Sequence, residues 1–263
     1  MRQPRLHSLI FIASIAAALS LASCQKELNF DREAEQDHNI IINFNAIVDT
    51  SALIYGQEYR NFFDEPYKVT AFKFYIHRIQ MINTDSGKVF ELPKDQYHLI
   101  DFGDSNSTRV KLGIQPFKYN RIAFTIGVDS ARNVSGAQTD ALDPAKGMFW
   151  TWNTGYIMAK LEGNSPMAAT PNNAIEYHIG GFKTGENVAE KITLLFPYTT
   201  EIDLKAGKTS ELTISANVNA WFFNPHDIMI SAHPTCMTPG TLAMQIAENY
   251  RKMFTVVDIV NEP

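Results

Sequence analysis

Alternation of apolar and polar residues with a period of two is the feature that most constrains this fold. From Ile40 to Val48 every second residue is apolar, and Asn43 and Asn45 lie among the residues between them. Similar patterns recur at residues 72–76, 122–126, 175–179, 192–196 and 212–218. Side chains alternate between the two faces of a strand, so each segment is predicted to be a strand with one buried face.

One of these strands is predicted to contain a bulge near Arg78. The apolar series of residues 72–76 does not continue in phase but resumes at Ile79 and Met81. One extra residue in a strand produces such a shift.

A single helix is expected near the C-terminus. Thr238 and Pro239 resemble a helix start, with a capping side chain followed by proline. Apolar residues then follow helical spacing, which predicts a helix over residues 241–254. Short strands with turn residues between them are typical of a β-sandwich. The chain is therefore predicted to be all-β, a single antiparallel β-sandwich with one C-terminal helix, forming one domain over residues 39–263.

The N-terminal segment has the pattern of an export signal. Arg2 and Arg5 precede an apolar run at residues 9–22, which is too short to span a bilayer. The run ends in Leu-Ala-Ser before Cys24, which resembles a bacterial lipobox. Residues 1–23 are predicted to be a signal peptide, and residues 24–38 a polar tether whose first residue, Cys24, is lipidated. The alternative is an ordinary cleavable signal with a cysteine there by chance; the chain is exported in both cases.

The charge balance argues against nucleic acid as a partner. The 263-residue chain has a formal net charge of −5. Removing residues 1–23 leaves 21 Lys and Arg against 28 Asp and Glu, a net charge of −7. Nucleic-acid binding needs a clustered basic surface. With Cys24 lipidated, Cys236 is the one remaining thiol, predicted to be buried or to act as a soft metal ligand.

A long polar loop returns to paired tryptophans at residues 127–163. Trp150 and Trp152 are two residues apart, so an extended backbone places both rings on one face. The loop of residues 130–148 is predicted to be ordered and held by these two rings instead of by regular structure. Closing a core is the simplest role for such aromatic side chains.

Three sequence blocks resemble the MbnP-like family of periplasmic copper-binding proteins. They are GVDSARNVSGAQTDALDPAKGMFWTWNTGY, YHIGGF and YHLIDF, and the resemblance extends from about Ile40 to about Val257. It implies a β-sandwich that binds copper outside the cytoplasm and works with a di-haem cytochrome c peroxidase-like partner. It also implies that a tryptophan, Trp150 or Trp152, is oxidised to kynurenine and helps to hold copper.

The candidate metal ligands are histidines and one thioether. His178 lies opposite the apolar residues of its strand and precedes two glycines that leave room for a ligand. We predict His178 as a copper ligand, with His98 or His77 as a second and Met148 as a soft partner, because imidazole and thioether groups suit Cu(I). The alternative for each histidine is a half-exposed or hydrogen-bonded side chain. For Met148 the alternative is a place in the core.

Three functional interpretations follow from these patterns. The first is an outer membrane lipoprotein, on the periplasmic or the cell-surface side, that binds copper in acquisition or handling. The second is a lipid-anchored binding or scaffold module that recognises a protein or a glycan without a metal. An enzyme in its own right is the least favoured, because no nucleophile–base pair or GxSxG motif stands out.

Overall fold

The computed structural model describes residues 38–153, 155–197, 201–204 and 207–262. The predicted signal peptide, Cys24 and the tether up to residue 37 lie outside these residues. The described chain is mostly β, as predicted, and its strands form two large sheets and one small one. Among the described residues, no helix has the length and apolarity needed to cross a membrane.

The first sheet has the order β16-β14-β1-β2, with β7 also paired to β1. Its strands are β1 (Asn39–Val48), β2 (Ser51–Ala52), β7 (Arg109–Gly113), β14 (Thr209–Asn217) and β16 (Phe254–Asn261).

The second sheet has the order β12-β9-β4-β10-β11-β15, and β3, β5 and β6 also pair with β4. Its strands are β3 (Glu58–Arg60), β4 (Pro66–Asn83), β5 (Lys88–Glu91), β6 (His98–Asp101), β9 (Arg121–Ile126), β10 (Ala159–Asn164), β11 (Ala174–Ile179), β12 (Glu190–Leu195) and β15 (Thr235–Cys236). A small sheet joins β8 (Lys118–Tyr119) to β13 (Ile202–Asp203).

Both large sheets are mixed, so the prediction of a single antiparallel sandwich is wrong. Strand β1 pairs in parallel with β14, and β11 pairs in parallel with β15. Alternation has the same period in parallel and antiparallel strands, so it does not reveal strand direction.

The main core lies between the two large sheets. Phe44 of the first sheet meets Phe74 and Phe124 of the second edge to face, with centroid distances of 6.0 and 6.2 Å. Phe254 of the first sheet contacts the same two rings at 5.3 and 5.1 Å. Such edge-to-face pairs add to the free energy gained by burying the rings.

The predicted bulge in β4 is confirmed. The pairing of β4 with β9 shifts register between His77 and Gln80, and Arg78 has a left-handed backbone with φ of 51°. The extra residue lets Ile79 and Met81 return to the buried face after Ile76, so an 18-residue strand contributes to one core along its length.

The predicted C-terminal helix is present but shorter. Helix α3 (Thr241–Tyr250) is capped at Gly240 instead of Thr238. It ends before Phe254, where β16 begins and pairs with β14. Of the predicted helical residues after Tyr250, residues 251–253 form a turn and only Phe254 lies in a strand. The other helices are short: α2 (Ser130–Val134), η1 (Asp140–Leu142), η2 (Pro144–Lys146), η3 (Pro171–Asn173) and η5 (Val218–Trp221).

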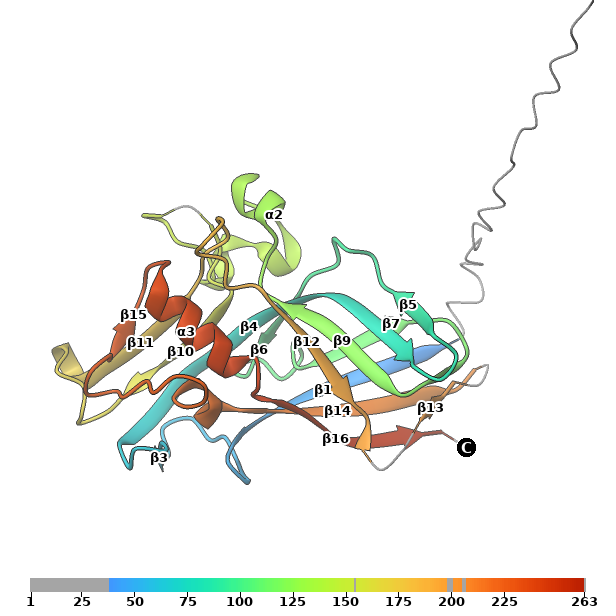
Figure 1. Cartoon of the computed structure of the whole chain (residues 1–263), viewed down its shortest axis with the longest axis horizontal. Helices are drawn as coiled ribbons and strands as arrows, with labels where there is room; N and C mark the ends of the chain where they lie inside the picture. Colours follow the sequence, from blue (N-terminus) through green and yellow to red (C-terminus); the bar gives the residue numbers. More distant parts are fainter. Residues whose placement is uncertain (1–37, 154, 198–200, 205–206, 263) are drawn as a thin grey trace, which may run out of the picture. The chain divides into compact units, whose positions relative to one another are not determined.

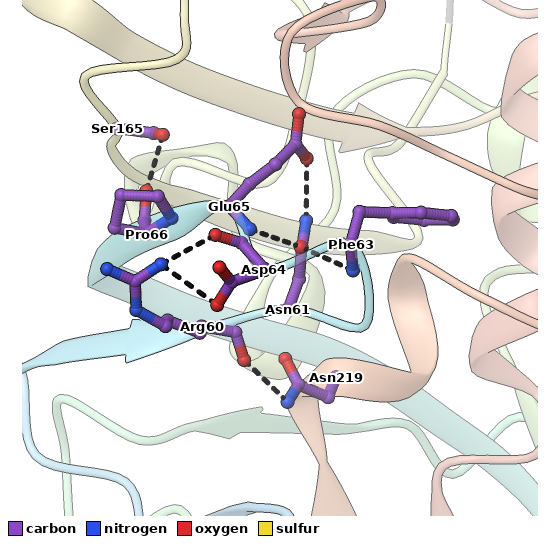
Figure 2. A network of polar contacts seen from close by, with 8 residues as sticks. All are labelled: Arg60, Asn61, Phe63, Asp64, Glu65, Pro66, Ser165 and Asn219. Atoms are coloured by element: carbon purple, nitrogen blue, oxygen red, sulfur yellow. Dashed lines mark hydrogen bonds and ion pairs between the residues drawn. The ribbon is translucent and has the colours of Figure 1, made fainter.

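A buried carboxylate fixes the turn between β3 and β4. Glu65 accepts hydrogen bonds from the side chain of Asn61 at 2.8 Å and from the backbone N–H groups of Ile230 and Ser231 at 2.7 and 2.9 Å. Burial raises the pKa of Glu65, but these hydrogen bonds outweigh it and leave the pKa below its ordinary value. In Figure 2 the side chain of Asn61 lies inside this turn. The guanidinium group of Arg60 donates to the carboxylate of Asp64, and the backbone carbonyl of Arg60 accepts a hydrogen bond from the side chain of Asn219.

Candidate functional site

The outer face of the second sheet, which is the face turned away from the first sheet, carries the candidate site. Lys73, Tyr75 and His77 of β4 alternate with the core residues, so they project from this outer face. Residues 128–153 and 155–157 form a covering segment over it, and its helix α2 stands on the opposite side of β4 from β1 and β14 (Figure 1).

A second hydrophobic cluster forms beneath the covering segment, and we call it the outer cluster. Its buried members are Tyr75, Leu99, Val128, Leu142, Met148, Trp150, Tyr156 and Ile157.

Asn133 attaches helix α2 to the rest of the covering segment. Its side-chain N–H groups donate to the carbonyls of Val128 and Asp129 at 2.8 and 2.9 Å, and its oxygen accepts from the N–H of Tyr156 at 2.8 Å. At Gly155, where φ is 110°, a Cβ atom would lie 2.7 Å from that oxygen. Only glycine fits there, so a single buried amide and one glycine fix the loop.

The two tryptophans touch but differ in burial. Phe149 and Tyr156 form an isolated bridge, and the segment between them carries both rings. The ring centroids of Trp150 and Trp152 are 5.7 Å apart, although residues 151–153 form bends instead of the extended backbone that the prediction assumed. Trp150 is 3% exposed, whereas Trp152 is 58% exposed. The expectation that both rings hold the loop is therefore wrong for Trp152. Short helices and Asn133 contribute instead.

Trp150 fills the space that the two glycines were expected to leave open. A Cβ atom at Gly180 would lie 2.5 Å from Cη2 of Trp150, so the ring rests against the backbone there. Positions 178 and 180 lie on the same side of an extended chain. The contact therefore places the indole ring on the side of the chain that His178 occupies, two residues further along, and brings together two of the sequence blocks that carry the family resemblance.

His178 is oriented by a carboxylate. Its Nε2 lies 2.7 Å from Oε1 of Glu162, and Nζ of Lys160 lies 3.2 Å from the same oxygen. The hydrogen bond to His178 lowers the pKa of Glu162 to about 2, against the raising effect of burial, and Lys160 adds to the lowering. An ionised carboxylate bonded to Nε2 holds the ring and leaves Nδ1 as the atom for a ligand, an arrangement common in metal-bound histidines.

His77 is a neutral imidazole. It is 1% exposed, and burial lowers its pKa to about 4 despite the nearby Asp129 carboxylate. Its ring stacks on Tyr97 at a centroid distance of 4.7 Å, and Tyr97 donates a short hydrogen bond to Asp129. Nδ1 of His77 is buried and has no hydrogen-bond partner among the described residues. A neutral ring with a free nitrogen is the form that binds metals.

His98 faces the other side of the sheet. It pairs with Ile76 of β4, and Ile76 is buried in the main core. Cross-strand partners share a face, so His98 points away from the side on which His77 lies. Burial lowers the pKa of His98, and its Nε2 is buried with no partner among the described residues.

Met148 and Cys236, the two sulfur-containing side chains among the predicted ligands, are both buried. Met148 is fully buried in the outer cluster. Cys236 is also buried, as one of its two predicted roles required, and desolvation raises the pKa of its thiol to about 11. A protonated thiol is a weak metal ligand, so the structure favours the buried role for Cys236.

The predicted ligands are not brought together into one site. Strand β10 lies between β4 and β11, and His178 pairs with Lys160, which pairs with Lys73. Two strand spacings and the rise from Lys73 to His77 place the Cα atoms of His178 and His77 roughly 16 Å apart. The described residues include no group of three or more His, Cys, Asp or Glu side chains able to hold a metal. The ligand roles of the individual residues stay predictions.

Unsatisfied polar atoms are concentrated around the outer cluster. Tyr75 Oη, His77 Nδ1 and Trp150 Nε1 are buried without hydrogen-bond partners among the described residues. Buried polar atoms normally have partners, so such groups are candidates for binding something. Sequence reasoning missed Glu162, Tyr97 and Asp129, because their contacts depend on strand register and on the fold of the covering segment.

Comparison with models of protein families identifies the family of this chain. The family model described as MbnP matches residues 37–238. Among curated proteins, none matches the chain. The solved structure of MbnP from Methylosinus trichosporium is similar at 14% identity and a TM-score of 0.47, covering 86% of this chain and 99% of that one. Since the family model covers more than half of the sequence, this chain belongs to the MbnP family.

Proposed function

We propose that this chain is an exported copper-binding lipoprotein that acts in copper acquisition or handling with a di-haem peroxidase partner. Anchoring at Cys24 would hold it at the outer membrane. The observation that carries the proposal is the contact of Trp150 with Gly180, because Gly180 lies two residues after His178 and on the same side of the chain. Membership of the MbnP family supports the same function.

The chemistry of these residues suits Cu(I). His178 is the proposed imidazole ligand, since Glu162 bonds its Nε2 at 2.7 Å and leaves Nδ1 for the metal. Trp150 is the proposed second group once it has been oxidised, because kynurenine carries an amine and a carbonyl that indole lacks. Bound copper would supply a soft cation to be stored or handed on. The chain's own part is to hold the imidazole and to exclude water with the covering segment.

Trp152 gives the proposed partner access to the site. It is 58% exposed and its ring centroid lies 5.7 Å from that of Trp150. An exposed ring in contact with a buried one offers a route for oxidation from the surface. Kynurenine has an oxygen in place of one indole carbon, so the intact mass of protein co-expressed with the partner reports the conversion.

Copper titration tests the proposal. The mature protein, co-expressed with a di-haem peroxidase, is titrated with Cu(I) against a competing chelator. We expect one equivalent to bind in the parent, and His178→Ala to weaken binding by about tenfold or more. His226→Ala is the matched control, because His226 also bonds a carboxylate, Glu248, but lies outside the outer face. Equal affinity in the parent and His178→Ala contradicts the proposed site.

The alternative, a binding module without a metal, has its own supporting feature. A pocket of about 350 Å³ is bordered by Phe62 and Phe223, whose rings stack at 3.8 Å, and by Arg60, Asn219 and Lys252. Exposed aromatic faces beside amide and charged groups suit a glycan or a peptide. Failure of copper uptake together with unmodified tryptophans would favour this function.

A further inference from the structure

A polar pocket lies where three strands end. Asp49 follows β1, Arg60 ends β3 and Asn217 ends β14, and all three line one pocket of about 350 Å³. This volume falls in the range of small-molecule sites. It is the pocket that supports the alternative function. Figure 1 shows β3 well separated from helix α2 of the covering segment, so the pocket is distinct from the proposed copper site.

Asn219 joins the segments that form one wall of this pocket. Its Nδ2 donates to the carboxylate of Asp49 at 2.9 Å and to the carbonyl of Arg60 at 3.0 Å, the second of which Figure 2 shows. Its Oδ1 accepts from the hydroxyl of Tyr67 at 2.7 Å. The side-chain oxygen of Asn217 accepts from the backbone N–H groups of Asp49 and Asn219 at 3.0 and 3.1 Å. The wall is therefore fixed by contacts within the protein before a ligand binds, which lowers the cost of binding.

The same wall keeps hydrogen-bonding groups in reserve. Oδ1 of the exposed Asp49 carboxylate has no hydrogen-bond partner among the described residues, and neither has Nδ2 of Asn217. Because Oδ1 of Asn217 bonds the backbone of Asp49, an acceptor and a donor lie beside each other here. Across the pocket, Asn224 accepts from Nζ of Lys252 at 3.0 Å and keeps its own amide N–H groups for another partner.

An exposed aromatic ring completes the lining. Phe62 is 66% exposed, and its ring stacks on that of Phe223 at a centroid distance of 3.8 Å. The charges around the pocket are balanced: Asp49 is negative, Lys252 is positive, and Arg60 is already paired with Asp64 at 2.9 Å. An apolar ring beside donors and acceptors, without an excess of one charge, suits an uncharged polar ligand.

We infer that this pocket binds an uncharged sugar at the end of a glycan, through Asp49, Asn217 and Asn224, with Phe62 against the sugar's C–H groups. Each sugar hydroxyl is both a donor and an acceptor, so neighbouring hydroxyls match a carboxylate oxygen beside an amide N–H. A peptide backbone carries only one donor and one acceptor per residue and offers fewer to a pocket of this size. Sugar binding here is independent of copper binding and gives the alternative function a ligand class.

Saturation-transfer NMR titration of the mature protein tests the inference. The probes are the methyl glycosides of glucose, galactose, mannose and N-acetylglucosamine, and we expect at least one to bind with a Kd below about 10 mM. Asp49→Asn keeps one oxygen for Asn219 but loses the charge, and should weaken binding about fivefold or more. Asp203→Asn, a change to an exposed aspartate on β13, is the matched control and should leave the Kd unchanged.

A second variant tests the aromatic wall without endangering the fold. Phe62→Ala removes an exposed ring and should weaken sugar binding about threefold or more, whereas Leu195→Ala, at a residue that is 63% exposed on β12, should have no effect. His178→Ala should bind sugar like the parent, and Asp49→Asn should bind copper like the parent, so the failure of either site is recognised separately.

Three results would overturn the sugar site. The first is that none of the four glycosides binds with a Kd below about 10 mM. The second is that Asp49→Asn and Phe62→Ala both bind the sugar with the affinity of the parent. The third is that acetyl-trialanine, titrated in the same way, displaces the bound glycoside at a lower concentration than the glycoside itself requires, which would assign the pocket to a peptide.

Discussion

The two faces of β4 show how one strand serves stability on one side and binding on the other. On the inner face, Phe72 and Phe74 are fully buried among other rings. On the outer face, Tyr75 and His77 are buried as completely, yet each keeps a polar atom without a partner among the described residues. Burial is therefore equal on the two faces of β4, while the chemistry of the buried side chains is not. The inner face of β4 buries apolar rings that pack, whereas its outer face buries side chains with polar atoms, which are candidates for binding something else.

The covering segment makes this difference possible. Without this segment, the outer face would meet water and its polar atoms would be hydrated. Asn133 and Gly155 fix the segment through one buried amide, and Trp150 seals it against Gly180. Water is thus excluded from this part of the outer face, and the burial of His77 keeps its imidazole neutral at physiological pH.

The largest expected effect is on the inner face. Phe74→Ala removes a ring that is fully buried and contacts Phe44, Phe102 and Phe254. We expect the free energy of unfolding to fall by about 3–5 kcal/mol, measured by denaturant titration, because the cavity adds to the lost transfer energy. Phe74→Leu, which leaves a smaller cavity, is the control and should cost less. A loss below about 1 kcal/mol for Phe74→Ala would remove the distinction between the faces.

A pH titration of stability sharpens the comparison on the outer face. The pKa of His77 falls from its ordinary value of 6.5 to about 4 on folding, so protonation favours the unfolded chain. The contribution of His77 to the free energy of unfolding is fully present above about pH 6.5. It is lost as the pH falls through 4, by about 3 kcal/mol in total.

His77→Phe isolates this contribution. Phenylalanine keeps the stack on Tyr97 and removes the unpartnered nitrogen, so the stability at pH 7 should stay level or rise. The difference between variant and parent should then grow as the pH drops from 6.5 to 4. A variant that is less stable by more than about 1 kcal/mol at pH 7 would show that His77 is kept for stability.

The smallest expected effect is at Trp152. Because its ring is 58% exposed, Trp152→Ala should lower the free energy of unfolding by less than about 1 kcal/mol. Trp150→Ala, which empties a buried position, should cost about 3–5 kcal/mol under the same conditions. Similar losses in the two variants would mean that both rings are structural.

Local patterns in the sequence predicted the strands but not their partners. The bulge at Arg78 and the strands around Ile40 and Ile122 follow from alternation, which depends on near neighbours alone. The predicted helix ended at Phe254, which is instead the first residue of β16, because its pairing with β14 is not visible in the sequence. The parallel pairing of β1 with β14 joins distant segments and leaves no local signal.

The candidate site was predicted by residue type and not by geometry. The sequence block that contains His178 was identified, and so was the position of His178 opposite the apolar residues of its strand. Its bond to Glu162 depends on the register between β10 and β11, which composition does not specify. The burial of Trp150 and the exposure of Trp152 depend on which of the two rings packs against Gly180, a feature of tertiary packing.

The most direct test of the central claim is to see which side chains respond to copper. Cu(I) is diamagnetic, so the imidazole and indole NMR signals of the mature protein, co-expressed with a di-haem peroxidase, can be followed through a titration. We predict that the His178 signals shift up to one equivalent of Cu(I) and then stop, with those of residue 150, while the signals of His226 stay fixed. A titration in which His178 does not respond, or in which His226 responds equally, would contradict copper binding on the outer face.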